Sequence, residues 1–148
     1  MQENILEVNN LNMHYETISG KVAAVKDITF HVKKGESFGL VGESGCGKTS
    51  VAMSLVQLQA DNAKISSGSI KLDGQELIGL SENELRSVRW DGISIVFQGA
   101  MNAWNPVIKI GEQIREAIRE HYPNNTKLQN IEKIKELFEM VGLDESII

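Results

Sequence analysis

The sequence has 148 residues, about the length of one average domain with a hydrophobic core of its own. Hydrophobic residues make up 41% of it and charged residues 24%, as in a folded globular chain. The formal charge of −5 comes from interspersed acidic and basic residues without a Lys/Arg block, so we expect no nucleic-acid partner. No apolar stretch reaches the roughly 18 residues of a membrane span and no secretory signal stands at the start, which favours a cytoplasmic location.

Alternation of apolar and polar residues predicts β structure in the first third of the chain. In residues 25–32, Val25, Ile28, Phe30 and Val32 are interleaved with polar side chains. This pattern is typical of an antiparallel layer with one partly exposed face. The expected strands are residues 5–8, 11–15 and 25–32.

The middle of the chain predicts a buried strand, a glycine-rich loop and a helix in succession. Residues 37–41 are short and mainly apolar, as in a strand that is covered on both faces. Apolar residues then recur at helical spacing over residues 48–58, so a helix is expected to begin in the loop. Residues 69–72 and 93–97 predict two further strands, the second of them buried.

The remaining segments predict helices. Ser81 and Glu84 have the spacing of a capping box that opens a short helix. Residues 110–118 and 128–141 each carry an apolar stripe at helical spacing, and Gly142 marks the end of the second helix.

The segment from Gly42 to Thr49 (GESGCGKT) fits the pattern G-x-x-x-x-G-K-[ST]. Glycines let consecutive backbone N–H groups curl around phosphate oxygens, and the N-terminus of the next helix adds its dipole. In this pattern the lysine, Lys48, meets the β- and γ-phosphates and the hydroxyl of Thr49 ligates Mg²⁺. The competing interpretation is a glycine-rich turn that only joins a strand to a helix, but the expected strand and helix on either side favour a phosphate loop.

Cys46 is the only cysteine and lies inside this loop. It fills a position where a small residue is needed, and its thiol need not be reactive. If the loop binds nucleotide, saturating Mg-ATP should slow alkylation of Cys46.

Phosphate loops occur in kinases, GTPases and many ATPases, so other segments must define the class. With those segments included, the sequence resembles the ATP-binding subunits of ABC transporters, most closely the oligopeptide/dipeptide branch. The resemblance covers nearly the whole chain. It rests on residues 11–15 (LNMHY), 24–30 (AVKDITF), 34–36 (KGE), 40–49 (LVGESGCGKT), 95–98 (IVFQ), 101–107 (MNAWNPV) and 110–114 (IGEQI), in that order.

The resemblance implies roles for individual residues. Tyr15 corresponds to the aromatic residue that stacks on adenine, although it could instead be a core aromatic of a strand. Gln98 corresponds to the glutamine whose amide reaches Mg²⁺ and the attacking water, although it could be a strand-edge residue with a satisfied amide. Trp104 falls near the family's permease contact or folds back onto the helices. The implied set is Tyr15, Gly42, Glu43, Ser44, Gly45, Cys46, Gly47, Lys48, Thr49 and Ser50 for the nucleotide, Lys48 and Gln98 for catalysis, and Thr49 and Gln98 for the metal.

The implied fold class is α/β: an ABC-type P-loop NTPase core with an incomplete parallel sheet, an N-terminal antiparallel β layer and the start of an α-helical subdomain. Residues 1–98 would form the β layer and the core up to the glutamine loop, and residues 99–148 the beginning of the helical subdomain. The 148 residues contain no signature motif like Leu-Ser-Gly-Gly-Gln, no apolar strand ending in Asp-Glu and no switch histidine. We therefore interpret them as an N-terminal fragment and expect negligible ATP hydrolysis from them alone.

The implied function is that of the ATP-binding subunit of an ABC importer. Its cofactors would be ATP and Mg²⁺, and its cargo peptides or a related solute such as nickel. A second ATPase subunit, a membrane permease and, indirectly, an external solute-binding protein would be its partners, which would hold it at the inner face of the membrane. The alternatives are a non-transport ABC-type clamp and, less favoured because no Arg-rich lid follows the loop, a soluble small-molecule kinase.

Overall fold

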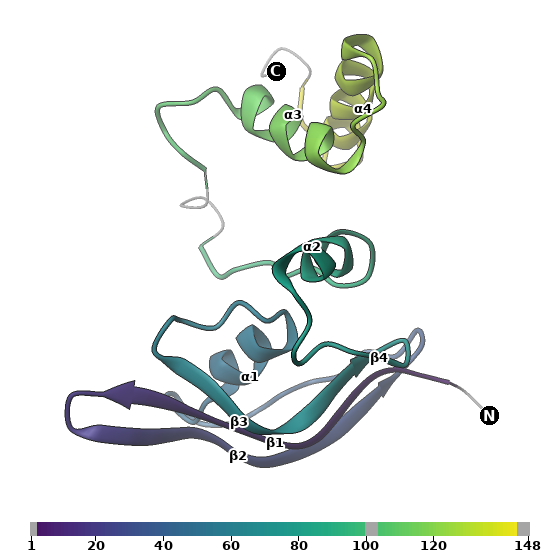
Figure 1. Ribbon diagram of the computed structural model, residues 1–148. Coiled ribbons are helices and arrows are strands. Elements are labelled where there is room, and N and C mark those ends of the chain that lie inside the picture. Colours follow the sequence, from purple (N-terminus) through teal and green to yellow (C-terminus); the bar gives the residue numbers. More distant parts are fainter. Residues whose placement is uncertain (1–2, 100–103, 145–148) are drawn as a thin grey trace. The chain divides into compact units, whose positions relative to one another are not determined.

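The computed structural model describes residues 3–99 and 104–144. The chain divides into two compact units, Met1–Ile95 and Val96–Ile148, and each is described by itself. The first unit holds an antiparallel sheet with two helices, and the second holds a helical hairpin (Figure 1).

The sheet of the first unit has the strand order β2-β1-β3-β4, and every neighbouring pair is antiparallel. Helix α1 covers one face of this sheet (Figure 1), where Val51 and Leu55 of the helix pack into the core. The antiparallel layer expected from the sequence is therefore confirmed. The strands are β1 (Asn4–Thr17), β2 (Gly20–Lys33), β3 (Ala63–Leu72) and β4 (Gln75–Glu76), and the helix is α1 (Lys48–Leu55).

The two expected strands 5–8 and 11–15 form one continuous strand, β1, with an irregularity between them. The register of β1 shifts between Val8 and Leu11 against β2 and between Asn9 and Asn12 against β3, and in each pairing β1 contains one extra residue there. A bulge of this kind moves the later residues to the opposite face. The buried positions accordingly change from Leu6 and Val8 to Leu11 and Met13.

The two strands that flank β1, β2 and β3, are also irregular beside this bulge. Asn10 donates from Nδ2 to Asp27 Oδ1 at 2.7 Å, and the Asp27 backbone N–H donates to Asn12 Oδ1 at 3.0 Å. On the other side, a Cβ on Gly68 would lie 2.7 Å from Leu11 Cα, so β3 can approach β1 this closely only with glycine there. We call these three positions, Asn10, Asp27 and Gly68, the bulge line.

Helix α2 (Glu82–Asp91) opens with the capping box that the sequence predicts. The Ser81 hydroxyl accepts from the backbone N–H of Glu84, and the Glu84 carboxylate accepts from the backbone N–H of Ser81. Near its other end, Arg89 donates to the carbonyls of Val56 (2.8 Å) and Gln57 (2.7 Å), the two residues that follow α1. The guanidinium therefore caps the negative end of α1 and ties the two helices together.

The second unit pairs helix α3 (Ile110–His121) with helix α4 (Lys127–Met140), close to the two predicted helices. Ile118, Ile134 and Phe138 form its buried cluster. Two residues of the predicted apolar stripe, Leu128 and Val141, are exposed, since both lie at the ends of α4. No helix among residues 3–99 and 104–144 is long and apolar enough to cross a membrane.

The predictions of buried strands at residues 37–41 and 93–97 are wrong for this structure. Both segments lack strand pairing, and residues 37–41 are exposed. A strand needs a hydrogen-bonded neighbour, and the strands of the described residues pair only with one another. Instead, Phe38 stacks on Phe30 of β2 with ring centroids 4.9 Å apart.

Helix α1 also ends at Leu55, three residues before the predicted end at position 58. Gln57 adopts a positive φ of 52°, which stops the helix.

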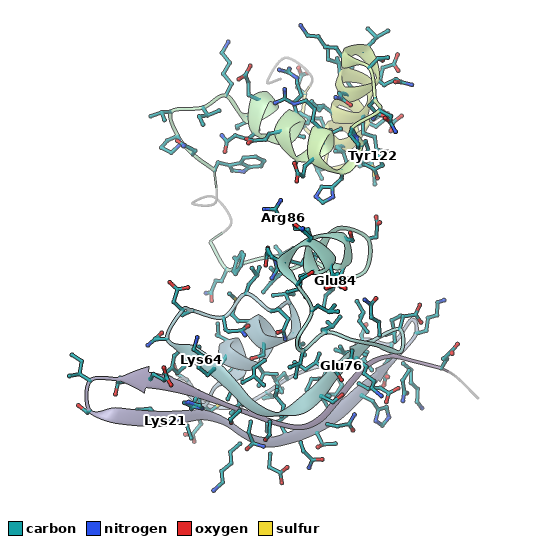
Figure 2. The ribbon with its side chains drawn as sticks, viewed as in Figure 1. Lys21, Lys64, Glu76, Glu84, Arg86 and Tyr122 are labelled. Carbon is teal, nitrogen blue, oxygen red and sulfur yellow. The ribbon has the colours of Figure 1, made fainter. Side chains whose placement is uncertain are left out.

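Glu76 joins β4 to β3 through its carboxylate (Figure 2). The carboxylate accepts from Ser69 Oγ and from the backbone N–H groups of Ile70 (3.0 Å) and Ile78 (3.1 Å). Burial raises the pKa of Glu76, but these hydrogen bonds and the charge of Lys71 outweigh it, so the pKa lies below its ordinary value.

We predict that Glu76→Gln lowers the thermal midpoint at neutral pH and that the deficit shrinks in acid. Because the folded-state pKa is depressed, the carboxylate stabilises the fold fully above its unfolded-state pKa and loses this effect as pH falls through the folded-state value. Thermal melts across that range measure the effect, with the exposed Glu132→Gln on α4 as the control. A deficit of the same size at every pH would contradict the prediction.

Candidate functional site

The predicted phosphate loop lies directly before α1, which begins at Lys48. Residues 42–46 are exposed, and Gly47 is the N-cap residue with φ of 96°. The N–H groups of the first turn of a helix have no partner within the helix, and the helix dipole favours a negative group near them. The loop and α1 therefore present a site suited to an anion.

Lys48 folds back over the loop that precedes it. Its ammonium donates to the backbone carbonyls of Gly42 (2.8 Å) and Glu43 (2.6 Å), and Cys46 Sγ lies 3.6 Å away. The ammonium is thus held over the loop by two neutral backbone carbonyls. An arriving phosphate would offer it a charged acceptor in exchange, and such hydrogen bonds are stronger.

The loop is anchored to the sheet through Gly47. A Cβ at this position would overlap the carbonyl oxygen of Ala24 in β2. Within the loop, a Cβ on Gly42 would lie 2.7 Å from Cys46 Sγ. The glycines at positions 42 and 47 therefore allow the close packing of the loop on itself and on β2.

Tyr15 connects β1 to α1 on the same side of the sheet. Its hydroxyl lies 3.0 Å from Ser50 Oγ, and either oxygen can be the donor. The Tyr15 ring packs against the core of the first unit, and Ser50 is 9% exposed in the first turn of α1. Tyr15 and Ser50, both predicted to serve the nucleotide, are thus in contact.

A pocket of about 340 Å³ lies beside the loop. Its apolar wall includes Leu40 and Val41, from the segment that was expected to be a strand. Cys46 and Lys48 also line it, so the pocket borders the predicted site.

The predicted metal and catalytic residues belong to different units of the chain. Thr49 is exposed in the first turn of α1, next to the loop. Gln98 is also exposed and belongs to the second unit, as does Trp104, which is 43% exposed. Positions 100–103, which begin the segment predicted to follow Gln98, lie outside the described residues. No group of three or more His, Cys, Asp or Glu suited to a metal occurs in the described part of the chain.

Two contacts of the site region carry no signal in the sequence. Arg89 reaches backbone carbonyls that are 32 and 33 residues away, and backbone acceptors have no sequence signature. The close contact of Gly47 with Ala24 likewise depends on a backbone atom. The hydroxyl pair of Tyr15 and Ser50 joins two residues that the sequence singles out, but separately.

Comparison with known proteins identifies relatives of the chain. A family model described as "ABC transporter" matches residues 25–148. The chain is 39% identical over 143 residues to the oligopeptide transport ATP-binding protein AppD of Bacillus subtilis, covering 96% of this chain and 43% of that protein. It is 34% identical over 145 residues to the dipeptide transport ATP-binding protein DppD of Lactococcus lactis, covering 98% and 42%. The chain thus spans less than half the length of these curated relatives.

A solved structure shares the fold. The dimeric ATP-binding cassette MJ0796 bound to ADP and Pi superposes with a TM-score of 0.80 at 22% identity, covering 96% of this chain and 59% of that one. This similarity confirms the expected α/β fold class.

We predict that Gly47→Ala destabilises the first unit more than Gly45→Ala. Both glycines have positive φ, so alanine is strained at either position by about 1 kcal/mol. Only at Gly47 would the new Cβ also meet a backbone carbonyl, whereas at Gly45 it would meet open space. Denaturant unfolding measures the difference, and equal free energies of unfolding for the two variants would contradict it.

Proposed function

Because the chain belongs to the ABC transporter family, we propose that it binds Mg-ATP as part of the ATP-binding subunit of a peptide importer. The observation that carries this proposal is the loop of residues 42–47, with Lys48 held over it at the start of α1. The names of the relatives, oligopeptide and dipeptide transport ATP-binding proteins, support peptides as cargo, and a related solute such as nickel is the alternative. They also support an importer subunit over a soluble kinase or a non-transport clamp.

The residues of the site fit a magnesium-bound nucleotide. Lys48 would leave the carbonyls of Gly42 and Glu43 for the β- and γ-phosphates, while the first turn of α1 offers its free N–H groups. The exposed hydroxyl of Thr49 would hold Mg²⁺ beside them. When bound, the ion neutralises charge on the phosphates.

The remaining predicted residues complete this proposal. Tyr15 would stack on the adenine ring, and Gln98 would orient the attacking water. A second ATPase subunit and a membrane permease would be the partners, which would place the protein at the cytoplasmic face of the membrane. The dimeric state named for the solved cassette supports the first of these partners.

We predict that Lys48→Ala weakens Mg-ATP binding to the purified chain by about 10- to 100-fold, as expected for the loss of a charged hydrogen bond to phosphate. Isothermal titration calorimetry measures the affinity. The matched control is Lys64→Ala, which removes an exposed lysine of β3 (Figure 2) and should leave the affinity unchanged.

Alkylation of Cys46 gives a second measure of the same binding. The thiol is exposed in the loop, so Mg-ATP at a concentration near its Kd for the unchanged chain should slow labelling in that chain and in Lys64→Ala and have little effect in Lys48→Ala. Equal labelling rates with and without nucleotide, together with no heat of binding, would overturn the proposed function.

We further predict that the 148 residues bind ATP without turning it over. Phosphoryl transfer needs the metal, the water and charge stabilisation together, and the family's Asp-Glu, signature and histidine elements are not in this sequence. Phosphate release should equal that of Lys48→Ala in the same assay. Release clearly above that background would contradict the prediction.

A further inference from the structure

The hydrogen bond between Tyr15 and Ser50 carries an inference that rests on the proposed function and deepens it. We propose that Ser50 is a positioning residue, which holds the Tyr15 ring in place for the base of the nucleotide. The 3.0 Å contact joins a strand to the helix that begins at the phosphate loop. It thus links the part of the site that would meet the base to the part that would meet the phosphates.

The bulge in β1 places Tyr15 where it can make this contact. After the extra residue between Val8 and Leu11, alternation puts Leu11, Met13 and Tyr15 on one face. That face packs on α1, because Val51 of the helix lies in the same core cluster as Leu11 and Met13. In a regular strand, Tyr15 would lie on the face opposite Leu6 and Val8 and could not reach α1.

The backbone of Tyr15 is fixed on both sides. It belongs to β1, an interior strand of the sheet, and pairs with Val22 of β2 and with Ala63 of β3. Its ring keeps two rotatable bonds, so its orientation depends on what its hydroxyl and its faces contact. A hydrogen bond at the far end of the ring restricts both rotations.

Ser50 is a firm anchor for that hydroxyl. Its side chain is nearly buried, and its backbone carbonyl accepts from Ser54 Oγ at 2.7 Å within α1. A partner fixed in this way lowers the entropy that the ring loses when a base stacks on it, which is the benefit of preorganisation. The link should therefore act on binding of the base and not on binding of the phosphates.

Two variants remove the link from opposite ends. Tyr15→Phe keeps the stacking ring, and Ser50→Ala keeps the helix. Each should weaken Mg-ATP binding by about fivefold, as for one net hydrogen bond, and the double variant should be no weaker than either. Binding of magnesium tripolyphosphate, which has no base, should be unchanged in all three.

The control is Thr17→Val, which removes another hydroxyl near the end of β1. Thr17 Oγ1 donates to the Gly20 carbonyl in the hairpin turn at 2.7 Å, away from α1. It should leave the affinity for both ligands unchanged. Thermal melts of every variant show that each is folded.

Several results would overturn the inference while leaving the proposed function intact. One is Lys48-dependent ATP binding that is unchanged by Tyr15→Phe. Another is a loss of tripolyphosphate affinity in Ser50→Ala, which would make Ser50 a direct phosphate contact. Independent, additive losses from the two variants would also overturn it. Absence of ATP binding by the unchanged chain would instead overturn both proposals.

Discussion

The bulge line is the constraint on which the first unit depends. In β1, β2 and β3 the alternation of buried and exposed positions is offset by one residue at the bulge line. Apolar side chains before and after the bulge line therefore reach the same core. Asn10 and Asp27 hold the irregular backbone with side-chain hydrogen bonds, and Gly68 lets β3 come close. A polar network at the surface thereby determines which residues are buried, because a shift of one residue would turn Met13 and Tyr15 to the other face.

The phosphate loop depends on the same sheet. Gly47 packs on the Ala24 carbonyl, and the next residue, Val25, pairs with Met13 in the core. The position of the loop is thus set by β2, and β2 is set by its pairing beyond the bulge line. Lys48 follows Gly47 directly, so the place of its ammonium over the loop depends on the long-range pairing of the sheet as well as on the local sequence.

The sequence predicted the features that depend on neighbouring residues. The antiparallel layer, the Ser81–Glu84 capping box and the loop before α1 follow from local pattern, and the structure contains them. Residues 37–41 and 93–97 have the composition of buried strands, but a strand also needs neighbours, and here they have none among the described residues. The sequence predicted two strands where the structure has one, because Asn9 and Asn10 are typical of turns. Only tertiary pairing distinguishes a turn from a bulge.

The contrast between features set by neighbouring residues and features set by tertiary pairing also separates the phosphate part of the candidate site from the base part. Recognition of phosphate uses backbone N–H groups, glycines and one lysine within eight consecutive residues, so a short motif predicts it. In the proposed site the base would stack on Tyr15, whose direction depends on a bulge five residues earlier and whose hydroxyl contacts Ser50, 35 residues later. A motif can therefore indicate that a nucleotide tail binds, whereas the fit of the base depends on contacts that only the folded sheet and helix bring together.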